Sequence, residues 1–98
     1  MKTYLVVNAT PNPEGQEDLK IYSEAVGALL AKAGGQNPTR AKLEGVVKGK
    51  PDYPLMLMME FPNGETIKNL FESEAYQKLL PHRNNAFSNL NIYIFSDL

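Results

Sequence analysis

The spacing of hydrophobic and polar positions changes several times along the chain, and each change marks an expected element. Tyr4 to Ala9 is rich in β-branched and aromatic residues, is largely apolar on both faces, and is followed by turn-forming residues. This pattern predicts a central strand covered on both sides. From Leu19 to Ala33, apolar residues recur every three or four positions, which predicts an amphipathic helix. Pro13 and a run of acids mark its start, and Gly34-Gly35 mark its end.

The middle of the chain predicts two strands with different positions in a sheet. Gln36 to Val47 carry a weaker strand pattern with Pro38 inside it, which is typical of a strand at the rim. Residues 48–54 are polar and turn-rich, and they lead into a third strand from Leu55 to Phe61. On that strand one face carries Leu55, Leu57, Met59 and Phe61, and the other carries Met56, Met58 and Glu60. Both faces are mainly apolar, so both are expected to be covered.

The last third of the chain predicts helical turns and a closing strand. Residues 62–64 break the third strand, and Asn63 is placed to cap a helix that buries Ile67, Leu70 and Phe71. Ser73 is placed to cap a further helical stretch that ends at Pro81, with Tyr76, Leu79 and Leu80 as its buried stripe. Leu90 to Phe95 alternate in polarity enough to predict a fourth strand.

The order strand, helix, strand, strand, helix, strand predicts the α+β class and a ferredoxin-like fold. In this β-α-β-β-α-β arrangement, two helices pack on one face of a four-stranded antiparallel sheet. A chain of 98 residues buries one core, so residues 1–98 are expected to form a single domain. The apolar side chains on the other face then need a second cover. A second copy packed sheet against sheet is the simplest, with an interface in or above the standard ~1,200–2,000 Å².

Composition removes several classes of function. Ten basic and eleven acidic side chains give a net charge of −1, so neither nucleic acid nor an anionic membrane is an expected partner. The absence of cysteine removes disulfides, thiolate metal sites and cysteine nucleophiles, and with a single histidine we expect no metal and no cofactor. The chain has neither a signal h-region nor an apolar run of ~18 residues, so a cytoplasmic location is the expectation.

An ordered set of residues carries a resemblance to a known family. The set is Tyr22, Gly34-Gly35, Arg40, Leu43-Glu44-Gly45, Glu60-Phe61-Pro62, Ser73-x-x-Tyr76-Gln77 and Arg83. With its spacing, it resembles the domain-of-unknown-function family numbered 1330, of the dimeric α/β-barrel superfamily of ferredoxin-like folds, from about Tyr4 to Phe95. The resemblance implies a homodimer built through the sheets. The superfamily includes cofactor-free monooxygenases, isomerases and haem-degrading enzymes without a common catalytic set, so the fold does not select a reaction.

Two features depart from the family pattern. Family members usually have a shorter lead into the first helix than residues 10–16, and they often carry a histidine or an aromatic residue where this chain has Ala33. A site that used that side chain would lack it in this protein.

Two arginines match family positions, and each has two interpretations. Arg83 follows the tyrosine-containing helix, where a guanidinium beside a cleft can clamp a carboxylate or phosphate, or form a structural ion pair with Glu44 or Glu60. The two interpretations of Arg83 are evenly matched. Arg40 faces the same choice, and a structural role is favoured there because rim strands often carry charge.

Three further side chains are candidates for chemistry. His82, the only histidine, can act as a general acid or base, but a helix-end histidine bonding the last carbonyls after Pro81 is the favoured interpretation. Glu60 ends an apolar strand face, where it is either a general base or, as we favour, the partner of an arginine. Tyr76 either places its hydroxyl in a pocket or, as its spacing favours, is a core residue with a polar tip.

Two hypotheses for function remain open at this point. The first is a dimer that binds a small, anionic organic molecule between sheet and helices through Arg40 and Arg83, with Tyr76 and His82 at the pocket edge; a cofactor-independent enzyme is one form of it. The alternative is a non-catalytic interaction or structural dimer module in which every polar residue is structural. No nucleotide, serine-hydrolase or zinc-protease motif is present, so the catalytic residues are unknown.

Overall fold

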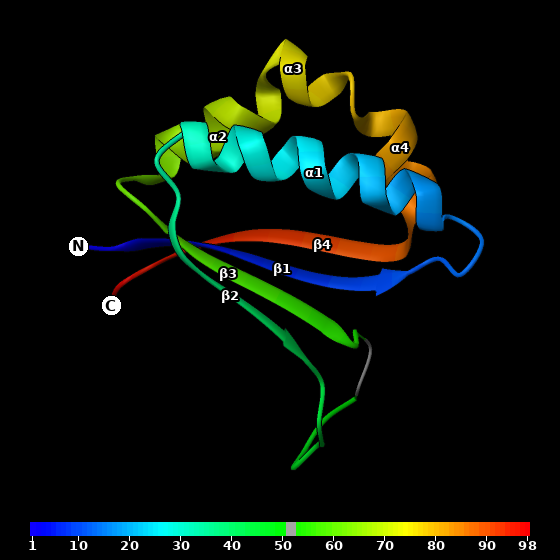
Figure 1. Ribbon diagram of the computed structural model, residues 1–98. Helices are drawn as coiled ribbons and strands as arrows, with labels where there is room; N and C mark the ends of the chain where they lie inside the picture. Colours follow the sequence, from blue (N-terminus) through cyan, green and yellow to red (C-terminus); the bar gives the residue numbers. More distant parts are fainter. Residues whose placement is uncertain (51–52) are drawn as a thin grey trace.

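The computed structural model describes residues 1–50 and 53–98 and has two layers, a twisted sheet and a layer of helices on one of its faces (Figure 1). The elements are β1 (Thr3–Pro11), α1 (Gln16–Lys32), β2 (Gln36–Lys42), β3 (Leu55–Phe61), α2 (Gly64–Glu72), α3 (Glu74–Gln77), α4 (Leu80–Ala86) and β4 (Phe87–Ser96). The four strands lie in the order β2-β3-β1-β4, and each neighbouring pair is antiparallel. The predicted α+β, ferredoxin-like fold is therefore confirmed.

The central position predicted for the first strand is confirmed. β1 pairs with β3 on one side and β4 on the other, so Leu5 lies between Met59 and Ile94. The side chain of Leu5 is fully buried under the helices, whereas Val6, which points the other way, is only half-buried. The core lies between the sheet and the helices and consists of Leu5, Tyr22, Leu30, Met59, Phe61, Ile67, Leu70 and Tyr76.

Both ends of α1 depend on glycine. At the C-terminus Gly34 has φ of +95°, which side chains other than glycine rarely adopt, and the N–H groups of Gly34 and Gly35 donate to the carbonyls of Ala31 and Leu30 at 3.1 and 3.0 Å. The predicted glycine cap is confirmed. At the N-terminus, Gly15 lies against α4 so closely that a Cβ atom would be 1.9 Å from the carbonyl oxygen of Asn85.

The helices on the β4 side begin at the predicted caps, but one boundary was predicted wrongly. The Asn63 side chain accepts a hydrogen bond from the backbone N–H of Thr66 at 2.9 Å, and Ser73 accepts one from that of Tyr76 at 3.2 Å. Pro81 does not end the helical stretch. It lies in the first turn of α4, where its missing N–H costs nothing, so α3 and α4 are separate helices.

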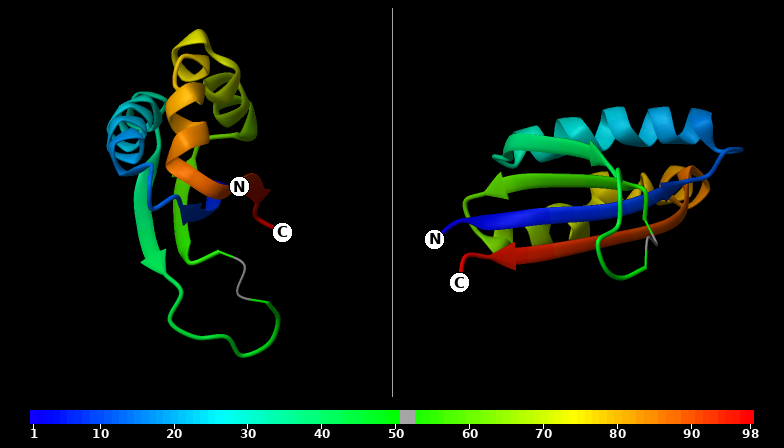
Figure 2. Two further views of the ribbon diagram at one scale, coloured as in Figure 1. Left: turned by 90° about the vertical axis from the view of Figure 1, so that its right-hand side faces the viewer. Right: turned by 90° about the horizontal axis from the view of Figure 1, so that it is seen from below.

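The strand pattern of residues 36–47 was also longer than the strand itself. β2 ends at Lys42, and residues 43–50 are exposed and run away from the helical layer (Figures 1 and 2). The strand is at the rim as predicted, and its register shifts between Gln36 and Thr39, around Pro38. The predicted connection at residues 48–54 includes 51–52, which lie outside the described residues. β4 is longer than predicted and begins at Phe87.

Among the described residues, no helix covers the second face of the sheet (Figure 2). Apolar side chains of β3 and β4 are exposed on that face. Met56 and Met58 are each 36% exposed, and beyond β1 lie Tyr93 at 44% and Phe95 at 54%. The register places Val6 between Met58 and Tyr93, so these side chains form one continuous surface, which we call the open face. The described residues leave the open face without a cover, as the sequence predicted.

The two ends of the described chain are joined at one end of the sheet. The carboxylate of Asp97 accepts hydrogen bonds from the backbone N–H of Lys2 at 2.9 Å and from the Tyr4 hydroxyl at 2.8 Å. These hydrogen bonds lower the pKa of Asp97 and raise the pKa of Tyr4. The backbone N–H of Asp97 also donates to the Lys2 carbonyl at 3.0 Å, so the outer ends of β1 and β4 are held together.

Candidate functional site

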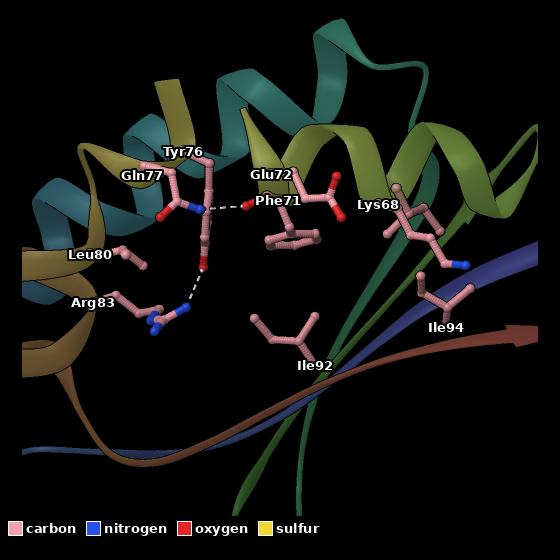
Figure 3. Close-up of a pocket in the computed structure, with 10 residues that line it drawn as sticks. Lys68, Phe71, Glu72, Tyr76, Gln77, Leu80, Arg83, Ile92 and Ile94 are labelled. Carbon is pink, nitrogen blue, oxygen red and sulfur yellow. Dashed lines mark hydrogen bonds between the residues drawn. The ribbon is translucent and has the colours of Figure 1, made fainter. Parts of the chain in front are cut away.

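A groove of about 470 Å³ lies between the sheet edge at β4 and the helices α2, α3 and α4 (Figure 3). Its lining residues are Ile67, Lys68, Phe71, Glu72, Tyr76, Gln77, Leu80, Arg83, Ile92 and Ile94. The walls are mainly aliphatic and aromatic, and the volume falls in the range of ~300–1,000 Å³ that is usual for small-molecule sites. Figure 3 shows the guanidinium of Arg83 at one end of the groove and the ammonium of Lys68 at the other.

Arg83 is a half-buried cation that has no acidic partner among the described residues. Its Nη1 donates to the hydroxyl of Tyr76 at 3.2 Å, and its Nη2 lies 3.5 Å from the amide oxygen of Asn84. The ion pairs among the described residues are Lys2 with Glu60 and His82 with Asp18. The predicted ion pair of Arg83 with Glu44 or Glu60 is therefore wrong. No carboxylate of the described residues neutralises the charge of Arg83.

Tyr76 has the buried ring that its helical spacing predicted and also lines the groove. The ring is 2% exposed and packs edge-on against Phe71 at 4.7 Å between centroids. The Ser73 cap fixes the start of α3, and the Gln77 side chain ties the helix to the carbonyl of Phe71 at 2.9 Å. These contacts hold the Tyr76 hydroxyl beside Arg83 (Figure 3). The two interpretations of Tyr76 are thus compatible in one side chain.

Tyr22 is a residue of this site that was noted in the sequence only as part of the helix stripe and the family pattern. It lies on α1, is 6% exposed, and its hydroxyl oxygen is 2.8 Å from that of Tyr76. Burial and the hydrogen bond with Tyr76 raise the pKa of Tyr22 well above its ordinary value, so this hydroxyl stays neutral. Two tyrosines on separate buried helix stripes are the signal that points to such a pair, since buried hydroxyls require partners.

A second hollow of about 360 Å³ also borders Arg83. It is lined by Arg83, Asn84, Phe87, Ser88, Asn89, Leu90 and Ile92. Arg83 and Ile92 border both hollows, and the amide and hydroxyl side chains make the second one more polar. Arg83 therefore borders a mainly apolar groove and a more polar hollow, and both lie along β4.

The structure does not bring Arg40 or Glu60 to the groove. Arg40 lies exposed on β2, the strand at the opposite edge of the sheet from β4. Glu60 lies opposite Tyr4 in the pairing of β1 with β3, on the same face of the sheet as Met56 and Met58. Its carboxylate is 3.2 Å from the ammonium of Lys2 and 3.3 Å from the amide nitrogen of Asn37. This contact raises the pKa of Lys2. An ion pair for Glu60 was predicted correctly, but its partner is a lysine and not an arginine.

His82 also lies outside both hollows. Its Nδ1 is 2.7 Å from a carboxylate oxygen of Asp18 on α1. His82 therefore connects α4 to α1. The favoured interpretation, a helix-end histidine bonding the last carbonyls, is wrong because α4 continues past His82 to Ala86. Of the predicted site residues, the structure brings Tyr76 and Arg83 together at the groove and leaves the other three elsewhere.

No group of three or more histidine, cysteine, aspartate or glutamate side chains within residues 1–50 and 53–98 is placed to hold a metal ion. Over the same residues, no helix has the length and apolar character needed to cross a membrane.

Comparison with known proteins identifies the family. The model of the family described as "Domain of unknown function (DUF1330)" matches residues 2–98. The chain belongs to the DUF1330 family. This confirms the resemblance seen in the sequence. A search of the curated proteins finds no match.

Solved structures of the same shape support the DUF1330 assignment at the level of the fold. A protein of unknown function from Rhodopseudomonas palustris has a TM-score of 0.82 at 16% identity, over 99% of this chain and 82% of that one. A dimeric ferredoxin-like protein of unknown function from Jannaschia sp. CCS1 has a TM-score of 0.74 at 11% identity, over 99% and 100%. SnoaB from Streptomyces nogalater, a cofactor-independent oxygenase, has a TM-score of 0.68 at 9% identity, over 98% and 92%. At these identities the likeness shows the fold alone.

Proposed function

We propose that this protein binds a small organic anion in the groove beside β4, with Arg83 as the residue that contacts the charge. The observation that carries the proposal is a half-buried guanidinium without an acidic partner among the described residues, at the end of an otherwise apolar groove. A guanidinium held by neutral acceptors keeps its attraction for a carboxylate, because no protein charge compensates it. The proposal is for binding and assigns no reaction.

The charges around the groove favour an anion of single charge. Lys68 and Glu72 are one helical turn apart on α2 and both line the groove, so their charges offset each other. Arg83 then supplies one net positive charge. A highly charged ligand would meet Glu72 and apolar walls, and would leave some of its charge unpaired.

We also propose that the protein is a homodimer packed through the open face. A continuous apolar surface is left uncovered by the described residues, and it consists of Val6, Met56, Met58, Tyr93 and Phe95. Proteins of the same fold from other organisms are described as dimeric, which supports the proposal. The groove lies on the helical side of the sheet, so sheet-to-sheet packing leaves it accessible. A cytoplasmic location stays a prediction from the sequence.

The experiment that tests the groove is an NMR titration of the ¹⁵N-labelled protein with small aryl and alkyl carboxylates. We expect saturable shifts at amides around the groove, such as those of Phe71, Tyr76 and Ile92. Arg83→Ala should weaken binding by about tenfold or more, because a hydrogen-bonded charge pair is lost. Arg40→Ala is the matched control, since it removes an exposed arginine from the opposite edge of the sheet, and it should leave binding unchanged.

Two results would contradict the proposal. If no carboxylate shifts the groove amides, or if Arg83→Ala binds as tightly as the unchanged protein, the polar residues are structural and the alternative of an interaction module stands. Native mass spectrometry of freshly purified protein adds an independent measurement, because it reports the oligomer and any retained small molecule together. A retained molecule should be lost in Arg83→Ala and kept in Arg40→Ala.

A further inference from the structure

Three polar groups form a line from the core to the groove. The hydroxyl of Tyr22 on α1 is 2.8 Å from that of Tyr76 on α3, and the Tyr76 oxygen accepts a hydrogen bond from Nη1 of Arg83 on α4 at 3.2 Å. Tyr22 is 6% exposed and Tyr76 is 2% exposed, whereas Arg83 borders both hollows. Figure 3 shows the Tyr76 hydroxyl pointing toward Arg83 at the end of the groove.

These three groups carry more hydrogen-bonding protons than they have acceptors for among themselves. A phenol oxygen carries one proton and can accept two hydrogen bonds, while the guanidinium only donates. In one arrangement Tyr22 donates to Tyr76, and the Tyr76 proton is left over. In the other arrangement Tyr76 donates to Tyr22, and the Tyr22 proton is left over. Among the described residues, neither hydroxyl has a further recorded acceptor.

The surroundings of the two hydroxyls favour the first arrangement. Tyr22 packs edge-on against the rings of Tyr76 and Phe87, at 6.2 and 5.7 Å between centroids, and it does not line either hollow. An unpaired Tyr22 proton would therefore lie in an apolar core, which is unfavourable. Tyr76 lines the groove, so its unpaired proton can meet a ligand there. Tyr22 keeps its proton for this bond, because burial raises its pKa.

We propose that the Tyr76 hydroxyl is the second hydrogen-bond donor to the ligand, beside Arg83, and that Tyr22 is a positioning residue that directs the Tyr76 proton into the groove. The inference rests on the proposed function and narrows its ligand to a monocarboxylic acid with an apolar body. A carboxylate accepts from both donors at once, and the rest of such a molecule lies against Phe71, Ile92 and Ile94. Arg83 also polarises the Tyr76 oxygen, which makes the hydroxyl a stronger donor.

The test compares two probes that differ in their acceptor group. The acid is 3-phenylpropionate, and its neutral counterpart is 3-phenylpropan-1-ol; the readout is the ratio of their dissociation constants from NMR titration. Tyr76→Phe should reduce the preference for the acid by about tenfold, because a hydrogen bond to a charged group is lost. General damage to the groove would weaken the binding of both probes equally and leave the ratio of their dissociation constants unchanged. Tyr93→Phe, on the open face, is the matched control and should not alter it.

The Tyr22→Phe variant shows which of the two hydroxyls donates the hydrogen bond between them. If Tyr22 donates to Tyr76, its removal lets the Tyr76 proton turn toward other orientations and weakens acid binding. If Tyr76 donates to Tyr22, the same change frees a proton for the ligand and strengthens acid binding. Unchanged or tighter binding of the acid to Tyr22→Phe would overturn the proposal. Site-specific 3-fluorotyrosine at residue 76 is a milder change that keeps the ring, and its more acidic hydroxyl should tighten acid binding.

Failure of this inference is distinguishable from failure of the proposed function. Suppose that Arg83→Ala weakens binding of the acid, and that Tyr76→Phe leaves the ratio of the two dissociation constants unchanged. The groove then binds an anion without the help of Tyr76, and only the further inference is contradicted. If Arg83→Ala has no effect on binding of the acid, both the further inference and the proposed function are contradicted.

Discussion

At the residue scale, Tyr76 takes part in core packing and in the site at once. Its ring is among the largest fully buried side chains, and its oxygen links a neutral tyrosine to a cation. The loss of this oxygen leaves the Tyr22 hydroxyl unpaired in the core and removes one of the two acceptors of Arg83. The stability of the fold and the orientation of the site should therefore change together at this residue.

We expect Tyr76→Phe to lower the free energy of unfolding by about 1–3 kcal/mol, the range for leaving a buried polar group unsatisfied. The double variant Tyr22→Phe with Tyr76→Phe should be less destabilised than the sum of the two single variants, because it leaves no orphaned hydroxyl. Urea denaturation of the four proteins measures this coupling. Additive effects would mean that the two hydroxyls do not interact in solution.

Tyr22 should also make stability depend on alkaline pH. Its pKa in the folded protein is raised above the unfolded value of 10.0, so its contribution is complete below about pH 10 and is lost as the pH rises further. The loss of stability begins near pH 10, and it approaches about 1.4 kcal/mol per pH unit only above about pH 11, where the unfolded tyrosine is almost fully ionised. Urea denaturation between pH 8 and pH 11 measures the slope. The slope should be smaller in Tyr22→Phe, and parallel curves for the two proteins would contradict the prediction.

Residue types predicted which side chains were candidates, but not all of their partners. Arg83 and Tyr76 were both candidates from the sequence, and they do meet at the groove. The partners of Glu60 and His82 are Lys2 and Asp18, which are far away in the sequence. Such pairs depend on strand register and helix packing, and neither can be inferred from residue type and spacing alone. Tyr22 was missed as a site residue because its position on the helix stripe is equally well explained by packing.

At the scale of elements, α1 and α4 can approach each other closely because Gly15 has no side chain. A Cβ atom there would overlap the Asn85 carbonyl, which is backbone and has little freedom to move. The contact also positions α4, and with it Arg83. The His82–Asp18 pair links the same two helices, so the placement of the guanidinium depends on this helix pair.

Gly15→Ala should destabilise the protein by about 1–3 kcal/mol, because the methyl group forces α1 and α4 apart. Gly27→Ala is a matched control in the same helix, where a Cβ would meet no atom within 4 Å. This control should stabilise the protein by about 0.5–1 kcal/mol through its higher helix propensity. Thermal or urea unfolding of both variants measures the difference. Equal stability of the two variants would contradict the close packing at Gly15.

Element types and caps were predictable, and element ends less so. Asn63, Ser73 and Gly34 cap helices where the sequence places them, since caps are local and have clear chemical requirements. Pro81 was read as a helix end although proline is equally suited to a first turn. The strand pattern of Gln36 to Val47 continued beyond β2 because pairing with β3 decides where the strand ends, and composition does not.

At the scale of the whole molecule, the sheet has one face under helices and one open face. The sequence predicted this imbalance from strands that are apolar on both sides and from helices that can cover only one. A single chain leaves Phe95 54% exposed, and Met58 36% exposed. The proposed sheet-to-sheet dimer would cover these side chains and account for their composition.

Met58→Glu should convert the proposed dimer into a folded monomer, because the new carboxylate would be buried without a partner between two sheets. Ile21→Glu is the matched control, since Ile21 is an apolar residue that is 41% exposed on α1 and lies on the helical layer. Light scattering after gel filtration should give half the mass for Met58→Glu and the full dimer mass for Ile21→Glu. A monomeric unchanged protein, or a dimeric Met58→Glu, would contradict packing through the open face.

The joined outer ends of β1 and β4 determine how the fold responds to mechanical force. Lys2 and Asp97 are hydrogen-bonded to each other and directly flank the antiparallel strands β1 and β4. A force that pulls these two residues apart therefore acts across the strands and along their hydrogen bonds. The bonds between β1 and β4 then break one after another, as in a zipper, and not all together. We expect the protein to unfold at low force in this direction, with β4 and one wall of the groove leaving first.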